Sequence, residues 1–557
     1  MATDRVVTLV VGAGPTGLTL AVELARRGVP FRLIDREVER TRTSRAIGTQ
    51  ARTVEVFRVM GIPESALEPA ARPRALRFAE RDRTLARIPL GDGRPGAPPR
   101  LISMDESDTE RVLEQRLEQL GGRVERSTEL LGFRVDGDRV IATLRGPGGA
   151  SELEARFLVG ADGAHSTVRR EAGIGFAGAA YPERFLLADL DLDWDLPHDE
   201  GHIWIGDDGL VAAIPLPGER RFRVIVPLPP AYAAKEYESE AEIAAEAETF
   251  LGLRAGVPLR RIGDPAWASA FRIQRRQADR YRHGPVFLAG DAAHVHSPVG
   301  GQGMNTGIQD AFNLGWKLAL ASRDQAAPGL LDTYQSERHP IARGVLRGTH
   351  LGTRLFLAQN PLMRAVREQA VPAIVSISPI RRRILAAISQ LTIGYRGSSL
   401  SVDADERDEP RRWLRRDARG LRAGDRVPDA TFVEARGNAP IELFDLISQG
   451  WTLLLFPGDN ATPETTIALE QVTRQVQNAV GDAVRSYLVP GAPANGSAAE
   501  TTLVDPAGKV AQMFGARQGL VALVRPDGYL GYRGRLDQPG ELASYLARVF
   551  AMQLREA

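Results

Sequence analysis

The N-terminal segment alternates between apolar runs and glycine-rich breaks in a pattern typical of a βαβ unit. Residues 6–11 form a short, β-branched apolar run, which predicts a buried parallel strand. Apolar residues then recur at helical spacing over residues 18–25, and a second short run, Phe31–Ile34, ends on Asp35. The order strand, helix, strand predicts the beginning of a doubly wound α/β domain.

Further along, the pattern becomes first that of an antiparallel sheet and then that of helices. Residues 186–227 alternate apolar and polar positions around a turn at Gly218–Arg220, as a hairpin does. Val286–Ala289 is again a buried strand, and helical spacing prevails from there to about residue 395. Beyond a highly charged stretch, strands are expected at Leu453–Phe456 and Leu520–Val524.

These changes of pattern predict how the chain is organised. We expect a Rossmann-like α/β domain built from residues 1–180 and 275–400, with an antiparallel-sheet domain inserted at residues 181–274. Residues 401–423 are expected to be a linker, and residues 424–557 a separate C-terminal domain.

The break after the first strand fits the G-x-G-x-x-G motif in the context that this motif requires. Gly12 permits the tight turn, Gly14 lets the backbone approach a pyrophosphate, and Gly17 allows close helix–strand packing. The helix that follows begins at Pro15 and Thr16 and offers free N–H groups to phosphates. With Asp35 placed to accept hydrogen bonds from a ribose, the motif predicts a bound dinucleotide, either FAD or NAD.

Two further motifs favour FAD. The first is Gly160–Ser166, which contains Asp162, and the second runs from Leu288 through Gly290 and Asp291 to Asn305. An aspartate that ends a strand, as Asp291 does, can hydrogen-bond the ribityl hydroxyls of a flavin. The glycine-rich stretch after it opens a helix, whose N-terminal amides stabilise the anion formed when a flavin is reduced.

With these three motifs in this order, residues 5–345 resemble the single-component, class A FAD-dependent aromatic hydroxylases of the para-hydroxybenzoate and phenol hydroxylase type. The resemblance implies noncovalent FAD, with NADPH or NADH as a transient electron donor. It also implies hydroxylation of a phenolic or aromatic polyketide substrate by O2 through a flavin C4a-hydroperoxide. Residues 424–557 resemble the thioredoxin-like C-terminal domain of phenol and polyketide hydroxylases, on the segments Gly424–Asp429, Trp451–Phe456 and Leu523–Gly528.

The family's FAD-contacting positions are carried over residue by residue. They correspond here to Gly12, Gly14, Pro15, Thr16, Gly17, Asp35, Arg36, Arg45, Glu106, Asp162, Gly290, Asp291, Pro298, Gly301, Gln302, Gly303, Met304 and Asn305. In that family Asp162 lies where both FAD and the nicotinamide cofactor depend on it.

The chain departs from the family pattern at three of its expected site positions. Asp35 replaces the commoner Glu, and Glu106 stands where a Gln usually contacts FAD. Phenol hydroxylases tend to carry, near Ile47, an Asp that helps to activate the phenol, so the sequence identifies no catalytic base. Ile47, Trp204, Phe222 and Phe271 are expected to line the substrate pocket, with core packing an equally good interpretation for the three aromatic residues.

The composition of the chain excludes or disfavours several classes of function. The 71 basic and 70 acidic residues give a net charge of +1, which does not favour a nucleic-acid partner. The chain has no cysteine, so thiol chemistry, disulfides and Cys-ligated metals are excluded, including a redox role for a thioredoxin-like domain.

His294 and His296 are expected to be structural, and no metal site is expected. No apolar run has membrane-spanning length, and the N-terminus has no signal-peptide pattern, so a cytoplasmic protein without a membrane partner is expected.

Two alternatives to aromatic hydroxylation stay open. One is Baeyer–Villiger oxygen insertion into a polyketide ketone or quinone on the same scaffold. The other is a flavin-binding protein without catalytic turnover, which the Asp162 motif disfavours because storage needs no access for a nicotinamide cofactor. The C-terminal domain is expected to serve packing or self-association, and a homodimer is one expected outcome.

Overall fold

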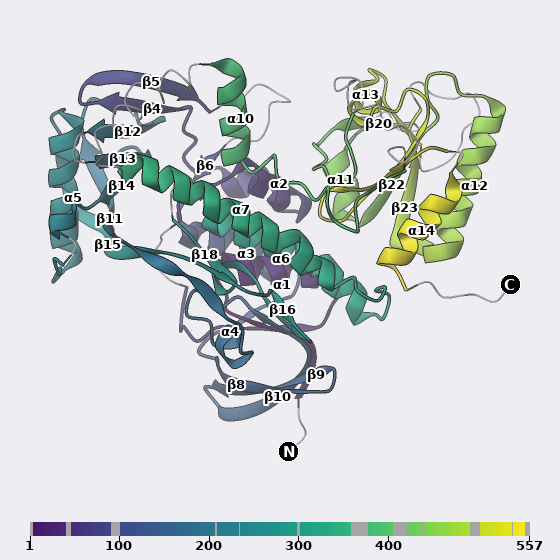
Figure 1. Cartoon of the computed structure of the whole chain (residues 1–557), viewed down its shortest axis with the longest axis horizontal. Helices are drawn as coiled ribbons and strands as arrows, with labels where there is room; N and C mark the ends of the chain where they lie inside the picture. Colours follow the sequence, from purple (N-terminus) through teal and green to yellow (C-terminus); the bar gives the residue numbers. More distant parts are fainter. Residues whose placement is uncertain are drawn as a thin grey trace. The chain divides into compact units, whose positions relative to one another are not determined.

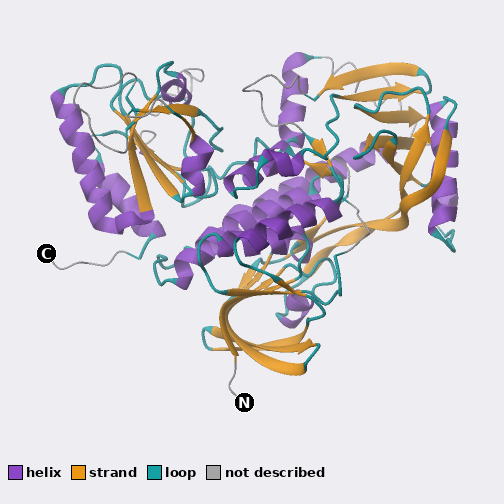
Figure 2. Cartoon of the chain, turned by 180° about the vertical axis from the view of Figure 1, so that it is seen from behind, coloured by secondary structure: helices purple, strands orange, loops and turns teal. Residues whose placement is uncertain are grey.

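The computed structural model describes residues 4–40, 46–90, 101–206, 209–232, 234–297, 301–357, 377–404, 420–435, 439–490, 502–536 and 538–551. The chain forms two compact units, shown along the chain in Figure 1 and by secondary structure in Figure 2. The first unit contains Met1–Phe57, Ile62–Ala311 and His339–Leu391, and the second contains Arg58–Gly61, Phe312–Arg338 and Thr392–Ala557. None of the described helices is both long and apolar enough to cross a membrane.

The first unit contains a sheet whose central strands are parallel. Its strand order is β16 (Arg282–His283), β17 (Val286–Leu288), β10 (Gly149–Gly160), β1 (Asp4–Val11), β2 (Phe31–Ile34) and β7 (Val124–Glu125), with β9 (Arg139–Gly146) paired to β10 and β8 (Glu129–Asp136) paired to β9. The strands β1, β2, β10 and β17 pair in parallel, and Leu9, Val10, Leu158 and Val159 in them are fully buried. Burial on both faces explains why these strands are continuous apolar runs.

The predicted βαβ beginning is confirmed. The helix α1 (Pro15–Ala25) follows β1 and has Pro15 in its first turn, where the missing N–H costs nothing. The strand β2 has the predicted limits, and β17 ends one residue before the predicted strand does. Other helices of this unit are α2 (Ala51–Val59, which extends into the second unit), α3 (Glu106–Gln119), α4 (Thr167–Glu171) and α10 (Ser378–Ile388).

A second, antiparallel-rich sheet forms the rest of the first unit. Its order is β18 (His294–Val295), β15 (Arg260–Ala278), β11 (Phe176–Asp193), β14 (Arg221–Pro227), β13 (Gly209–Pro215), β12 (Glu200–Gly206), β4 (Ala75–Glu80) and β5 (Arg83–Pro89). The predicted hairpin around Gly218 is confirmed as the antiparallel pair β13–β14. The helix α5 (Glu240–Ala255) packs against one face of this sheet, as Figure 2 also shows. A separate two-stranded sheet pairs β3 (Gly48–Thr49) with β6 (Ile102–Ser103).

The second unit is built around a five-stranded sheet. Its order is β19 (Val402–Asp403), β26 (Leu530–Gly534), β25 (Leu520–Val524), β22 (Trp451–Phe456) and β23 (Val484–Leu488), and a smaller sheet has the order β21 (Pro440–Glu442), β20 (Thr431–Glu434) and β24 (Leu503–Val504). The helices are α11 (Leu443–Ser448), α12 (Pro463–Val480), α13 (Lys509–Phe514) and α14 (Pro539–Val549). The strands predicted at Leu453–Phe456 and Leu520–Val524 are confirmed, whereas most of the expected linker, residues 405–419, lies outside the described residues.

Two long helices contribute to the core of the second unit. The C-terminal half of α6 (Gly303–Ser322) and the first residues of α7 (Asp332–Leu357) belong to this unit. Trp316 of α6 is 2% exposed and packs with its ring centroid 5.3 Å from that of Trp451 in β22. The C-terminal sheet therefore shares one hydrophobic core with Trp316 and Leu320 of α6.

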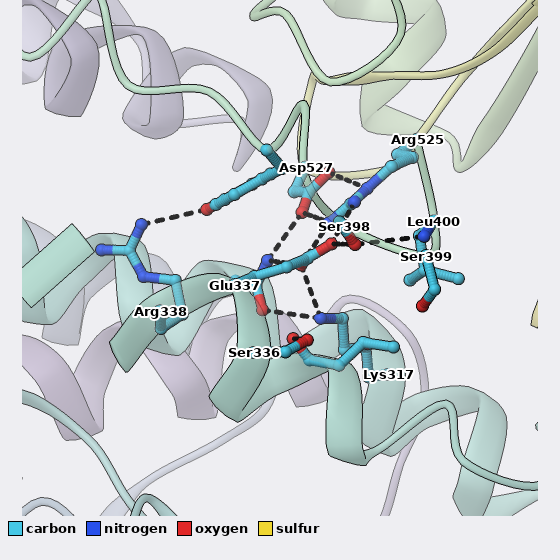
Figure 3. A network of polar contacts seen from close by, with 12 residues as sticks. Lys317, Ser336, Glu337, Arg338, Ser398, Ser399, Leu400, Arg525 and Asp527 are labelled. Atoms are coloured by element: carbon cyan, nitrogen blue, oxygen red, sulfur yellow. Dashed lines mark hydrogen bonds and ion pairs between the residues drawn. The ribbon is translucent and has the colours of Figure 1, made fainter. Parts of the chain in front are cut away.

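A buried network of charges lies in this core (Figure 3). Glu337 accepts hydrogen bonds from both terminal nitrogens of Arg525, at 2.6 and 2.9 Å, and from Lys317 Nζ at 2.8 Å. Asp527 accepts a further bond from Arg525 at 2.6 Å, so the two cations face two anions. Although burial opposes ionisation, Arg525 and Lys317 hold the pKa of Glu337 well below its usual range.

Removing one partner of such a network leaves charges buried without compensation. Glu337→Ala is expected to lower the free energy of unfolding by about 3–5 kcal/mol, because it removes the carboxylate that pairs with Lys317 and leaves Asp527 to pair with Arg525. The matched control is Glu80→Ala, which breaks an exposed ion pair with Arg83 and is expected to cost less than about 1 kcal/mol. Denaturant unfolding of both variants measures the difference, and equal losses would contradict a structural role for the buried network.

Candidate cofactor and substrate site

The three motifs predicted to bind the cofactor follow three strands that end in line. Val11 at the end of β1 pairs with Gly160 of β10, and Gly160 pairs with Leu288 of β17. The loops that begin after these strands therefore leave the sheet at one edge. In open α/β sheets, ligands bind outside the carboxyl ends of the parallel strands, which is where these loops gather.

Two of the three glycines of the first loop are required by the protein's own packing. A Cβ at Gly12 would lie 2.4 Å from the carbonyl oxygen of Ala161, and the φ angle of Gly12 is +101°. A Cβ at Gly17 would lie 1.9 Å from the carbonyl oxygen of Gly12. Since neither position has space for a side chain, β1, α1 and the start of the second motif meet through their backbones.

Gly14 differs from these two glycines. Its backbone is extended, with φ −71°, and the nearest protein atom to an added Cβ would be Glu110 Oε1 at 3.9 Å. The fold itself therefore tolerates a side chain at residue 14. The space that Gly14 leaves open lies at the N-terminus of α1, where free N–H groups favour an anion, and it fits the pyrophosphate of a dinucleotide.

Further glycines bring the third motif against α1. A Cβ at Gly290 would lie 2.5 Å from Thr16 Oγ1, and one at Gly307 would lie 2.3 Å from the same atom. Pro15 and Thr16 open α1, and Pro15 is buried in its first turn. Close packing around Thr16 thus joins the first and third motifs.

Asp35, expected to bind a ribose, reaches across to the glycine loop. Its carboxylate accepts hydrogen bonds from Ala13 N at 2.6 Å and from Glu37 N at 2.9 Å. Arg36 is exposed and pairs with Glu37 at 3.1 Å. The carboxylate of Asp35 therefore lies beside the loop that contains Gly14.

Two acidic side chains of α3 lie near the same loop. Glu106 Oε2 accepts a hydrogen bond of 3.4 Å from Ala46 N. Glu110 is 4% exposed, and burial, with a contribution from Glu106, raises its pKa to about 8. At neutral pH Glu110 is therefore largely protonated, so the space beside Gly14 faces a neutral acid instead of an additional anion.

Asp162 lies in the loop after β10. Its Oδ2 accepts hydrogen bonds from Thr167 N at 2.7 Å and Val168 N at 3.2 Å, at the start of α4. Its Oδ1 is buried and has no partner among the described residues, and burial raises the pKa of the carboxyl. An unmatched buried oxygen is expensive, so a ligand donor at this position would be favourable.

The third motif starts with a buried polar pair. His294 Nε2 lies 2.7 Å from Asp310 Oδ2, which also accepts a bond from Gly290 N at 3.2 Å. Asp291, which follows Gly290 in the chain, is exposed. No group of three His, Asp or Glu side chains within the described ranges is arranged to hold a metal ion.

Asn305 ties the start of α6 to β3. Its Oδ1 accepts from Gln50 N at 2.8 Å, while its Nδ2 donates to the carbonyl oxygens of Gly48 at 2.7 Å and Gly301 at 2.8 Å. Gln302 also contributes its carbonyl to the first turn of α6, where it accepts from Thr306 N at 2.9 Å. These bonds fix the glycine-rich loop through Gly301, Gln302, Gly303 and Met304, of which Met304 is 9% exposed.

His296 was not among the residues expected at the site. Its Nδ1 lies 2.9 Å from the carbonyl oxygen of Ser297 and therefore donates, which leaves Nε2 as an acceptor. Nε2 is buried without a partner among the described residues, and burial lowers the pKa to about 4. A Cβ at Gly303 would lie 3.7 Å from Nε2, so an unmatched acceptor lies against the first residue of α6.

The four residues expected to line a substrate pocket are in different surroundings. Trp204 and Phe222, 0% and 1% exposed, belong to the core under α5, which is the core interpretation of these two residues. Phe271 is half-buried on the opposite face of the sheet, beside Phe185. Ile47 is half-buried, and its carbonyl accepts a bond of 2.9 Å from Met104 N. Arg45 and Pro298 lie outside the described residues.

Comparison with known proteins identifies the family of the chain. The FAD binding domain family model matches residues 5–349. The 6-methylpretetramide 4-monooxygenase of Streptomyces rimosus is 36% identical over 98% of this chain and 93% of that protein. The pentachlorophenol 4-monooxygenase of Sphingobium chlorophenolicum is 33% identical over 95% of this chain and 94% of that protein.

A solved structure gives the same relationship. A ternary complex of aklavinone-11 hydroxylase with FAD and aklavinone has a TM-score of 0.76 and 28% identity, covering 98% of this chain and 99% of that one. The fold and the sequence thus define a flavoprotein of the FAD-binding-domain class. Within it, the chain belongs to the family of FAD-dependent monooxygenases that contains these relatives, and the resemblance drawn from the three motifs is confirmed.

The glycines of the first loop give a paired test of the pyrophosphate space. Gly14→Val is expected to fold with a melting temperature near that of the wild-type apoprotein but to lose FAD, because only the ligand occupies the space. Gly17→Val is expected to fail to fold, since its side chain overlaps the Gly12 carbonyl. Flavin absorbance and thermal unfolding measure both effects, and a Gly14→Val protein that retains stoichiometric FAD would contradict this location.

Proposed function

We propose that the protein is an FAD-dependent monooxygenase that uses NADPH or NADH and O2 to hydroxylate a phenolic or aromatic polyketide substrate. The observation that carries the proposal is that Val11, Gly160 and Leu288 end three parallel strands in register, so that the three motif loops leave one sheet edge. When bound, FAD supplies the redox chemistry: it takes electrons from the nicotinamide cofactor and activates O2.

The residues of the chain would divide the cofactor's groups among them. The loop at Gly14 and the N-terminus of α1 would hold the pyrophosphate, and Asp35 would hold a ribose. Asp291 would bind the ribityl chain, and the N-terminus of α6 would stabilise negative charge on the reduced flavin. Asp162 Oδ1 and His296 Nε2, both buried without partners among the described residues, fit a ligand that brings hydrogen-bond donors.

The same proposal assigns a role to each segment of the chain. The FAD-binding role is assigned to residues 1–180 and 275–400 and the substrate role to the sheet of residues 181–274. The segment 424–557 is proposed to be thioredoxin-like without redox activity, because disulfide exchange needs a thiolate and the chain has no cysteine. Its function would be packing or self-association, with a homodimer as one outcome, and the cytoplasmic location stays a prediction.

Product analysis under labelled oxygen tests the reaction. Purified holoprotein is incubated with NADPH, 18O2 and a panel of phenols and polycyclic aromatic compounds, and the products are analysed by mass spectrometry. We expect one 18O atom in a new ring hydroxyl of a substrate that also stimulates NADPH oxidation. A labelled lactone or ester would indicate Baeyer–Villiger insertion, and a flavoprotein that oxidises no NADPH or NADH with any aromatic compound would contradict the proposal.

A further inference from the structure

The antiparallel sheet of the first unit has a second face, opposite the one that α5 covers. Strand register assigns residues to the faces, because Ala188, Val224 and Ala213 form one row and belong to the core under α5. The neighbouring row must point the other way. It runs across four strands as Trp267, Asp189, Arg223 and Ile214.

Arg223 is the unusual member of this row because it is a fully buried cation. Its Nε and Nη2 each donate to Asp189 at 2.6 Å, and Nη2 also donates to Asp105 Oδ1 at 3.2 Å. The ring of Trp267 lies 5.0 Å from the guanidinium carbon. Nη1, at the remaining corner of the guanidinium, is buried and has no hydrogen-bond partner among the described residues.

The location of Asp105 connects this face to the cofactor loops. Asp105 immediately precedes α3, and its neighbour Met104 donates to the carbonyl of Ile47. Ile47 in turn precedes β3, which is held by the side chain of Asn305 at the start of α6. Hydrogen bonds, joined by residues that are neighbours in the chain, therefore link the start of α6 to Arg223.

Asp105 also differs electrostatically from an ordinary surface carboxyl. Burial and the nearby charge of Asp189 raise its pKa, while Arg223 opposes the shift. Asp108 raises the pKa further, and Arg221 lowers it. Since Asp189 already balances the charge of Arg223 through two bonds, Asp105 adds a second carboxyl beside the guanidinium, and Nη1 is the corner that neither carboxyl contacts.

The residues that follow Arg223 on this face of the sheet are mostly apolar. The next row on the same face contains Ser269, Leu187, Ile225 and Ala212, which are small or apolar. Phe185 and Phe271 follow one row further, with ring centroids 6.3 Å apart. An unmatched N–H donor in such surroundings suits a ligand that combines an aromatic ring with an oxygen acceptor.

We propose that Arg223 is a specificity-determining residue whose Nη1 donates a hydrogen bond to a phenolic, phenolate or ring-carbonyl oxygen of the aromatic substrate. This inference rests on the proposed function. A purely structural tie between the sheet and α3 would use Nε and Nη2 and leave the cost of an unmatched buried N–H unexplained. With a substrate oxygen as its acceptor, Nη1 orients the ring, and Asp189 holds the guanidinium in place.

The test compares two arginines of one strand. Arg223→Lys retains a cation beside Asp189 but removes the Nη1 donor. Arg221→Lys is the matched control, because Arg221 forms the equivalent cross-strand pair with Asp191 but is 40% exposed. Binding of 2-naphthol and of 2-methoxynaphthalene to the FAD-loaded proteins is measured from the change in flavin absorbance, together with FAD content and melting temperature.

In the wild type we expect 2-naphthol to bind more tightly than its methyl ether. Arg223→Lys is expected to raise the Kd of 2-naphthol roughly tenfold to a hundredfold, with FAD content unchanged, as for a lost hydrogen bond to a charged donor. Arg221→Lys is expected to leave both dissociation constants unchanged. If Arg223→Lys does not fold, the double variant Arg223→Met/Asp189→Leu removes both charges together and gives the same comparison.

The outcomes separate this inference from the function on which it rests. A yellow protein whose wild type binds both naphthalenes equally, or binds neither, overturns the assignment of Arg223. So does an Arg223→Lys protein that binds 2-naphthol as the wild type does. A protein that cannot be loaded with FAD contradicts the proposed monooxygenase function instead, and this is known before any ligand is added.

Discussion

The contact on which the cofactor edge depends is the approach of α1 to the end of β1 without any side chain between them. Gly17 touches the carbonyl of Gly12, and Gly12 touches the backbone of the second motif, so neither can carry a Cβ. Gly290 and Gly307 extend the same packing to the third motif at Thr16. Because the protein's own backbone fills these gaps, Gly14 is the glycine of the first loop whose space is left for a ligand.

Hydrogen bonds, and not apolar packing alone, connect this edge of the first sheet to the antiparallel sheet. Asn305 holds β3, β3 pairs with β6, and Asp105 just beyond β6 meets Arg223 in the second sheet. The face of the sheet that contains Arg223 is thereby placed relative to the loops that would hold FAD. The second unit has its own buried polar centre around Glu337, where the cations Lys317 and Arg525 are matched by Glu337 and Asp527.

The sequence allowed the local parts of this account to be predicted, because they depend on spacing within about twenty residues. The βαβ beginning, the hairpin at Gly218 and the three motif loops are of this kind. Alternation of apolar and polar residues in a strand, however, does not show which face of the sheet packs in the core and which lines a pocket. The sequence is therefore compatible with either position for Trp204 and Phe222, and the structure places both in the core. The pairing of Arg223 with Asp189 can be predicted only when the register of their two strands is known. In the sequence Arg525 and Asp527 are only part of a turn, and tertiary packing brings them to Glu337.

If the aligned strand ends hold a noncovalent FAD, the purified protein must contain flavin, and its flavin content can be measured. We expect a yellow protein with about one FAD per chain, which acid precipitation releases into the supernatant. A colourless protein that FAD does not reconstitute, or flavin that stays in the acid pellet, would contradict it.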